Sequence, residues 1–198
     1  MQEETLNGAK KVRTFIALEI SDEAREELAR IEDKLKEAEA DVKWIKPESI
    51  HLTLKFLGYI TEEKVPSIAK RLKDITSGTL PFNVVLSEIG VFPKWRYARV
   101  LWIGVEEGKE KVKTLAGMIE EAMEEEGFEK EKREFKSHIT IGRIRTSKKL
   151  EKLEKEAGKI KVNPAVSNIT KVVLFKSDLT PKGAIYTPLA VADFGSSK

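Results

Sequence analysis

The sequence predicts an α+β fold in which two similar lobes face each other across a cleft. Along the chain, short runs of strand length alternate with longer segments in which apolar residues recur every three or four positions, as on one face of a helix. The short runs are either apolar throughout or alternate between polar and apolar residues. The same order of elements occurs in both halves. The only two histidines, His51 and His138, lie 87 residues apart, and this offset brings the elements around them into register.

The elements of the first half follow from apolar spacing and from residues that begin or end them. Ser21 is a suitable N-cap, because its hydroxyl can accept a hydrogen bond from the first turn of a helix. The stretch from His51 to Leu57 alternates polar and apolar side chains, as a half-buried strand does, and Gly58 ends it. In chain order we expect a strand over 12–20, a helix over 22–38, an extended segment from 44, a strand over 51–57, a helix over 62–75 and a strand over 82–86.

The second half repeats this order. In chain order we expect a strand over 99–105, a helix over 112–122, a strand over 138–141, a short helix over 150–157 and strands over 171–175 and 184–191. The 87-residue offset carries the first strand and the first two helices onto predicted elements of the same type. Identity between the halves is otherwise weak, so the repeat lies in the pattern of elements. We therefore expect one domain over 1–198, made of lobes at about 11–92 and 98–192.

The composition excludes several classes of protein. The chain has no cysteine, which excludes disulfides, thiol catalysis and cysteine metal sites. No run approaches the roughly 20 apolar residues of a membrane span, and residues 1–8 lack the apolar core of a secretory signal, so we expect a cytoplasmic location. The net charge of +3 is too small to indicate a nucleic-acid binder, so any RNA recognition must be local.

Two tetrapeptides share the form His-apolar-Thr-apolar, namely His51-Leu52-Thr53-Leu54 and His138-Ile139-Thr140-Ile141. Because residues i and i+2 of a strand point to the same side, each tetrapeptide presents an imidazole and a hydroxyl together. Threonine accounts for only twelve of the 198 residues, so its recurrence after both histidines is not expected by chance. A lone histidine on a strand is more often structural, but a matched pair in a duplicated lobe favours a functional role.

A pair of imidazoles suits general acid–base catalysis of phosphodiester cleavage. With an ordinary pKa of about 6.5, one imidazole can carry a proton while the other does not. The neutral one would take a proton from the attacking water, and the imidazolium would protonate the leaving oxygen. The hydroxyls of Thr53 and Thr140 are expected to hold the non-bridging phosphate oxygens. A metal site is less favoured, because two histidines without a suitably spaced carboxylate or cysteine leave the coordination sphere too empty.

The sequence resembles the 2H phosphoesterase superfamily, named for two His-x-Thr/Ser-x motifs. Within it, the chain is similar to the bacterial and archaeal RNA 2′,3′-cyclic phosphodiesterases once called 2′-5′ RNA ligases. The resemblance spans nearly the whole chain and leaves out residues 1–10 and the tail after Ala192. Ser137 stands where the family usually has a proline. The stretches that carry the resemblance are 13–18, 42–45, 51–58, 91–93, 135–143 and 177–186.

The resemblance implies more than the residues alone can establish. The expected fold is a pseudo-twofold pair of lobes, with antiparallel sheets lining a central cleft and helices packed outside. The expected reaction is hydrolysis of RNA 2′,3′-cyclic phosphate ends to 2′-phosphates without metal or cofactor, with 2′-5′ ligation of RNA ends as its reverse. His51 is then the acid that protonates O3′ and His138 is the base that activates water, although the sequence itself does not fix these roles. Fragments of tRNA are candidate substrates, no membrane partner is expected, and the chain is expected to act as a monomer.

Two basic residues are candidates for contacts to the substrate phosphate. Lys55 lies four residues after His51, where strict alternation places it on the same face, although a solvated lysine is an equally good interpretation. Arg143 lies five residues after His138, so strict alternation turns it away unless Gly142 breaks the pattern, and many family members carry a basic residue here. Some aromatic side chains are candidates for stacking on a terminal base, with core or cleft wall as the simpler interpretation: Trp44, Phe56, Trp95 and Tyr186.

Two other functions remain open at this point. A 2H phosphodiesterase with the same residues could act on cyclic ADP-ribose phosphates or on 2′-5′ oligonucleotides. A module that binds RNA ends without turnover is the alternative from a different class. Binding alone would favour arginine or lysine over a titratable pair of histidines, which counts against the module.

Overall fold

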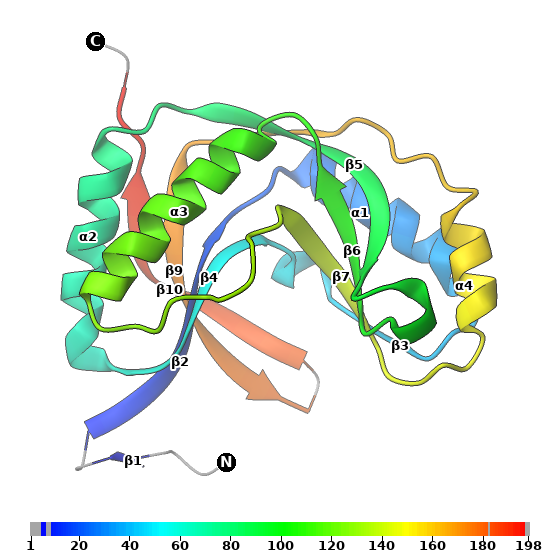
Figure 1. Ribbon diagram of the computed structural model, residues 1–198, viewed down its shortest axis with the longest axis horizontal. Coiled ribbons are helices and arrows are strands. Elements are labelled where there is room, and N and C mark those ends of the chain that lie inside the picture. The colour runs from blue at the N-terminus through cyan, green and yellow to red at the C-terminus, as the bar shows by residue number, and fades with distance from the viewer. Residues whose placement is uncertain (1–4, 7–8, 182, 197–198) are drawn as a thin grey trace.

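The computed structural model describes residues 5–6, 9–181 and 183–196 and has the expected α+β architecture (Figure 1). Every predicted element is present, most with longer bounds, and the short strands β1 and β8 were not predicted. The elements in chain order are β1 (Thr5–Leu6), β2 (Ala9–Leu18), α1 (Asp22–Lys36), β3 (Val42–Trp44), β4 (Leu52–Thr61), α2 (Val65–Ser77), β5 (Phe82–Phe92), β6 (Val100–Val105), α3 (Lys109–Glu125), β7 (His138–Ile144), α4 (Leu150–Ala157), β8 (Val166–Ile169), β9 (Lys171–Thr180) and β10 (Gly183–Asp193).

The strands form an antiparallel sheet that is best described as two half-sheets. Half-sheet A has the order β10-β9-β2-β4, and half-sheet B has the order β7-β6-β5-β8. They join between β4 and β7, where Leu52 lies opposite Ile139. β3 continues along the same edge of β7, and its three residues pair with the carboxyl-terminal end of that strand.

The 87-residue offset relates the two half-sheets. It maps β2 onto β6, β4 onto β7, α1 onto α3 and α2 onto α4. The half-sheets nevertheless draw on both halves of the chain, because β5 pairs with β6 and β9 pairs with β2. A division of the chain into lobes at 11–92 and 98–192 therefore stays a prediction.

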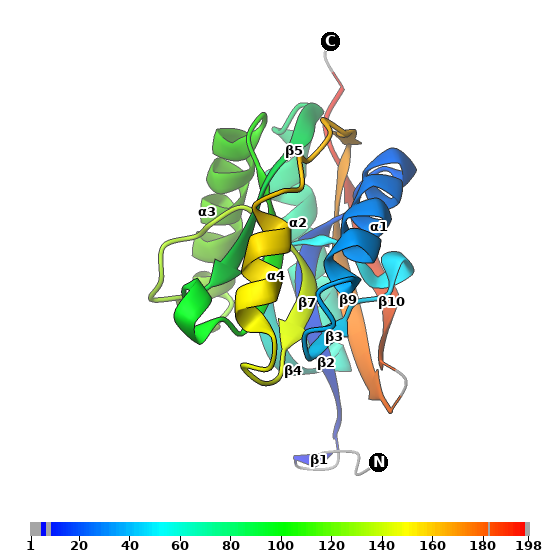
Figure 2. The same ribbon diagram turned by 90° about the vertical axis from the view of Figure 1, so that its right-hand side faces the viewer.

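Two of the helices, α1 and α3, cross from one half-sheet to the other. α1 follows β2 of half-sheet A but packs against β8 of half-sheet B, where it also contacts α4. α3 follows β6 of half-sheet B but packs against β4 of half-sheet A, beside α2. Figures 1 and 2 show these two helix pairs at opposite ends of the molecule. α1 and α3 thus each tie the two half-sheets together, whereas α2 follows β4 and packs against β9 and β10 of the same half-sheet.

The helix boundaries follow from local chemistry. The Ser21 hydroxyl accepts a hydrogen bond from the backbone N–H of Ala24 at 3.1 Å, which confirms the predicted N-cap of α1. The buried face of α1 carries Leu28, Ile31 and Leu35, spaced by three and four residues as predicted. No helix among the described residues is long and apolar enough to cross a membrane.

Candidate active site

The two His-x-Thr-x motifs meet where the half-sheets join. Leu52 of the first motif pairs with Ile139 of the second, the only position at which the described residues pair β4 with β7. Because the strands are antiparallel, the histidine of each motif lies toward the threonine of the other. The two histidines are then diagonal neighbours, which in a regular antiparallel pair are about 7–8 Å apart. One phosphate group fits between two imidazoles at such a separation.

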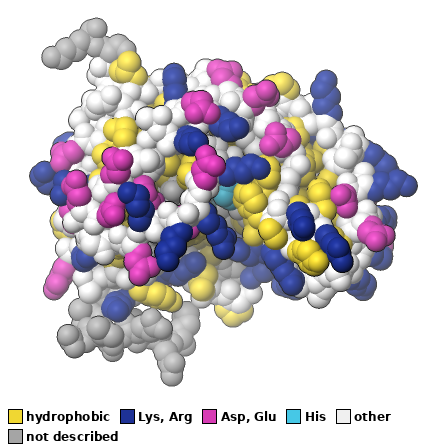
Figure 3. All heavy atoms as spheres, in the orientation of Figure 1, with side chains coloured by type: hydrophobic (Ala, Val, Ile, Leu, Met, Phe, Trp, Pro, Cys, Tyr) yellow, Lys and Arg dark blue, Asp and Glu magenta, His cyan; other side chains and the backbone are white. Residues whose placement is uncertain are grey.

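The motif side chains lie on the face of the sheet opposite the helices. Thr53 pairs with Ala17 of β2, which belongs to a small apolar cluster separate from the main core. Thr140 pairs with Trp102 of β6. Figure 3 shows histidine in a hollowed part of the surface, between the two halves of the molecule, with lysine, arginine and hydrophobic side chains beside it. The cleft that the sequence predicts is therefore present, and several basic side chains lie along it despite the small net charge.

Each motif runs into a β-bulge three residues after its histidine. Ile16 and Ala17 are consecutive on β2, but their partners on β4 are residues 55 and 53. Leu54, between these two partners, is therefore an extra residue on β4. In the same way, residues 101 and 102 are consecutive on β6, but their partners on β7 are residues 142 and 140, so Ile141 is an extra residue on β7. A bulge shifts the alternation of side chains by one position. The residue five places after each histidine, Phe56 or Arg143, therefore returns to the face of the imidazole.

The bulge overturns the predicted position of Lys55. Its partner on β2 is the core residue Ile16, so its side chain points to the helix side of the sheet. There its Nζ donates to Oε1 of Glu120 on α3 at 2.5 Å and to the backbone oxygen of Glu129 at 3.0 Å. The prediction that Lys55 shares the face of the imidazole is wrong, because strict alternation takes no account of the extra residue. Its buried ammonium group is not placed to bind a phosphate there.

Arg143 lies on the site face for the corresponding reason on β7. The residue before it, Gly142, pairs with the core residue Leu101, so Arg143 points the other way. Arg143 is exposed and lies close enough to Tyr186 for its charge to act on that hydroxyl. Burial raises the pKa of Tyr186, and the positive charges of Arg13 and Arg143 partly oppose the rise. The anticipated break in alternation is thus present, whereas the phosphate contact of Arg143 stays a prediction.

Both imidazoles are held by the same hydrogen bond. Nδ1 of His51 lies 2.9 Å from the backbone oxygen of Ser49, and Nδ1 of His138 lies 2.7 Å from that of Lys136. A carbonyl oxygen can only accept, so the hydrogen sits on Nδ1 and each neutral imidazole keeps a lone pair on Nε2. Nε2 can then accept a proton when neutral and donate one when protonated. Among the described residues, no group of three histidine, aspartate or glutamate side chains converges as metal ligands.

Aromatic rings fix the orientation of both imidazoles. The imidazole of His51 stacks on Phe15 with ring centroids 4.6 Å apart, and the ring of Tyr186 stands nearly perpendicular to it with centroids 5.1 Å apart. The second is contacted by Phe92 at 4.9 Å and by Trp102 at 6.3 Å. Of these rings, the sequence interpretation singled out only Tyr186. A usable signal was present, because Phe15 and Trp102 are aromatic residues on predicted strands related by the offset of 87.

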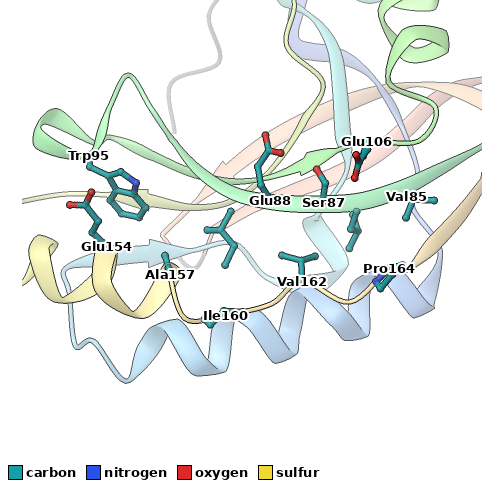
Figure 4. A pocket seen from close by; sticks show the side chains of 13 residues that line it. Val85, Ser87, Glu88, Trp95, Glu106, Glu154, Ala157, Ile160, Val162 and Pro164 are labelled. Atoms are coloured by element: carbon teal, nitrogen blue, oxygen red, sulfur yellow. The ribbon is translucent and has the colours of Figure 1, made fainter.

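The other aromatic candidates lie in different places. Phe56 is 61% exposed on the site face, 6.1 Å from Phe15 between ring centroids. It is therefore accessible to a base, whereas Trp44 packs against the core. Trp95 lines a separate hollow between β5 and the segment after α4, and its indole lies at one end of that hollow beside Glu154 (Figure 4).

That hollow is poorly suited to a phosphate ligand. It has a volume of about 720 Å³, and its wall includes carboxylates from Glu88, Glu106 and Glu154. Negative side chains oppose the binding of RNA phosphates. Neither histidine lines it. The candidate catalytic side chains therefore lie at the junction of the half-sheets and not in this hollow.

Burial makes both histidines less basic than usual. It lowers the pKa of His51 to about 4, against a smaller opposing effect of the hydrogen bond to Ser49. Burial also lowers the pKa of His138, and the nearby charge of Lys136 adds to this shift. The Lys136 ammonium group lies 4.2 Å above the ring of Trp102, which keeps it beside the second imidazole. Burial therefore favours the neutral form of both histidines near pH 7.

Comparison with known proteins agrees with the duplicated architecture. The family model described as LigT like Phosphoesterase matches the chain twice, over residues 18–102 and 103–186. Each match contains one His-x-Thr-x motif. The chain is also similar over nearly its full length to curated proteins. It is 37% identical to the RNA 2′,3′-cyclic phosphodiesterase of Methanothermobacter thermautotrophicus, over 91% of this chain and 98% of that protein. It is 34% identical to the protein of the same name from Aquifex aeolicus, over 90% and 95%.

Solved structures share the fold. TT0787 of Thermus thermophilus aligns with a TM-score of 0.75 and 26% identity, over 93% of this chain and 100% of that chain. E. coli LigT in its apo form aligns with a TM-score of 0.74 and 23% identity, over 94% and 99%.

Proposed function

The chain belongs to the LigT-like phosphoesterase family, and on that premise we propose that it hydrolyses RNA 2′,3′-cyclic phosphate ends through His51 and His138. Membership in this family confirms the resemblance drawn from the two motifs. Relatives of 34–37% identity bear the name RNA 2′,3′-cyclic phosphodiesterase, which supports the choice of substrate. The mechanism rests on one observation: the same backbone hydrogen bond leaves Nε2 of each imidazole free at the junction.

In the proposed reaction, His138 removes a proton from water as the water oxygen attacks phosphorus. The bond between phosphorus and O3′ breaks, and protonated His51 delivers its proton to that oxygen. The product carries a 2′-phosphate and a 3′-hydroxyl group. The hydroxyls of Thr53 and Thr140 donate to the non-bridging oxygens and stabilise the charge that develops there. The assignment of acid and base follows the family resemblance, since the two sites have matching geometry.

The reverse reaction uses the same groups. A 5′-hydroxyl of a second RNA takes the place of water and attacks the cyclic phosphate, which forms a 2′-5′ linkage without ATP. Fragments of tRNA with cyclic phosphate ends are suitable substrates for both directions. We further propose that the chain works as a monomer, because both histidines belong to one chain. Light scattering of the purified protein under turnover conditions tests this point.

Product analysis tests the proposed function. An oligoribonucleotide with a 2′,3′-cyclic end should yield a 2′-phosphate in the presence of EDTA, and addition of an RNA with a 5′-hydroxyl should yield some joined product. Formation of a 3′-phosphate, or loss of all activity in EDTA, would contradict the proposal. Faster turnover of cyclic ADP-ribose phosphates or 2′-5′ oligonucleotides would favour the alternative substrates. Retention of the RNA without any product would favour a binding module.

The pH dependence of kcat/KM should reflect the buried histidines. Catalysis requires one protonated and one neutral imidazole, and this form is most abundant midway between their two pKa values. Burial lowers both pKa values, that of His51 to about 4, so we expect a bell-shaped profile with its maximum below pH 6.5. The profile of kcat should peak at higher pH, because a bound phosphate anion favours the imidazolium. A maximum of kcat/KM above pH 7 would contradict this account.

A further inference from the structure

Two cations face each other beside the junction, on strands β3 and β7. Lys43 and Arg143 are Cα partners in the antiparallel register of these strands. Their neighbours Trp44 and Gly142 are also paired, and the side chain of Trp44 packs against the core. Lys43 and Arg143 therefore project together from the site face, and both are exposed. Directly opposite side chains have Cβ atoms about 4.5–5.5 Å apart.

This arrangement is unfavourable unless an anion is present. Like charges directly opposite each other on neighbouring strands are destabilising. Among the described residues, no carboxylate lies within 4.0 Å of either charged group, although Asp41 is only two residues before Lys43. A pair of cations without a counter-charge on a functional face fits a phosphate from the ligand.

The pair lies at a useful distance from the reacting phosphate. Arg143 follows Thr140 by three residues on β7, one of which is the bulge, so the two are roughly 7–10 Å apart along the strand. That separation is comparable to one nucleotide repeat of an extended RNA chain. The Arg143 charge also reaches Tyr186, which contacts the first imidazole from half-sheet A. The cation pair thus borders the catalytic junction without belonging to the two motifs.

We propose that Lys43 and Arg143 form a second phosphate site, which binds the phosphate on the 5′ side of the terminal nucleoside. The proposal rests on the proposed function and sharpens it, because it makes an oligonucleotide end a better substrate than a nucleoside 2′,3′-cyclic phosphate. Lys43 is the new member of the site. It acts in binding and does not touch the reacting atoms, so its loss should affect only substrates that carry the second phosphate.

The test compares three substrates in the wild type and in Lys43→Met. The first is a nucleoside 2′,3′-cyclic phosphate, the second carries an added 5′-phosphate, and the third is a dinucleotide with a cyclic end. Lys43→Met should lower kcat/KM for the second and third by about two- to fivefold, as expected for one exposed charged contact, and leave the first unchanged. The slope of log(kcat/KM) against log[salt] for the dinucleotide should become shallower by about 0.7.

Lys46→Met is the matched control. It makes the same chemical change three residues along the chain, at a lysine whose Nζ lies 3.7 Å from Glu48, and it should leave all three substrates unchanged. Equal losses on all substrates in Lys43→Met, or no loss on the phosphorylated ones, would overturn the second phosphate site. If the wild type hydrolyses none of them, the proposed function fails instead. In that case, calorimetry can measure the affinity of the corresponding 2′-phosphate products for the wild type, Lys43→Met and Lys46→Met. The second phosphate site predicts that only Lys43→Met loses affinity, and only for products that carry the second phosphate.

Discussion

Replacement of His138 or His51 by alanine is expected to lower kcat by about 10²–10⁴-fold, while KM changes little. Each variant loses one proton transfer in the transition state, and single general acid–base groups contribute factors of this size. The proposed contacts of Thr53 and Thr140 with the reacting phosphate do not depend on the missing imidazole, so substrate binding should persist. Single-turnover kinetics on an RNA with a 2′,3′-cyclic end measure the effect.

The double variant provides the control for a shared mechanism. If both imidazoles act in one concerted displacement, removal of the second should cost much less than removal of the first. Independent effects that multiply would contradict a single acid–base pair. Retention of a tenth or more of wild-type kcat by either single variant would remove that histidine from the mechanism. Unchanged thermal unfolding in all variants shows that the loss is chemical.

Glu120→Ala is expected to lower the free energy of unfolding by about 3–5 kcal/mol, because it leaves the buried ammonium group of Lys55 without its counter-charge. The Lys55 side chain is 4% exposed, and its bond to Glu120 joins β4 to α3 at 2.5 Å. Glu120 also accepts a hydrogen bond from the backbone N–H of Glu131 at 2.8 Å, and this bond is lost as well. Chemical denaturation at pH 7 measures the change.

Two further variants isolate the charge effect. Glu121→Ala changes the next, exposed residue of the same helix and should shift the free energy of unfolding by no more than about 0.5 kcal/mol. Lys55→Met in the Glu120→Ala background removes the unpaired charge and should recover a substantial part of the loss. Equal stability of Glu120→Ala and Glu121→Ala would show that the buried pair contributes nothing to the fold.

The histidine pair could be predicted from sequence because its signal is periodic and local. Strand alternation, a repeated threonine and one constant offset together place His51 and His138 on matching strands. The same reasoning failed for Lys55, because the extra residue at Leu54 leaves no mark in an alternating polar pattern. The register shift becomes visible only through pairing with β2. Strict alternation therefore predicts the face of each side chain correctly up to the threonine of each motif, but not after the bulge that follows it.

Long-range pairing accounts for the rest of what the sequence did not reveal. β5 belongs to the first half of the chain but pairs with β6 of half-sheet B, and β9 belongs to the second half but pairs with β2 of half-sheet A. No local sequence pattern encodes these pairings. Lys43 illustrates the same limit at the site. Its neighbour Arg143 is one hundred residues away, so the juxtaposition of two cations follows only from the pairing of β3 with β7.

The most direct test is ¹⁵N NMR of the histidine side chains during a pH titration, with and without a nucleoside 2′-monophosphate. The chain has only two histidines, so spectra of His51→Gln and His138→Gln assign every signal. In the free protein, both imidazoles should carry the neutral-state hydrogen on Nδ1 and titrate below pH 6.5. Binding of the nucleotide should raise both pKa values and shift both Nε2 signals. If the nucleotide binds while only one histidine responds, or neither does, the two imidazoles do not share a phosphate and the central claim is wrong.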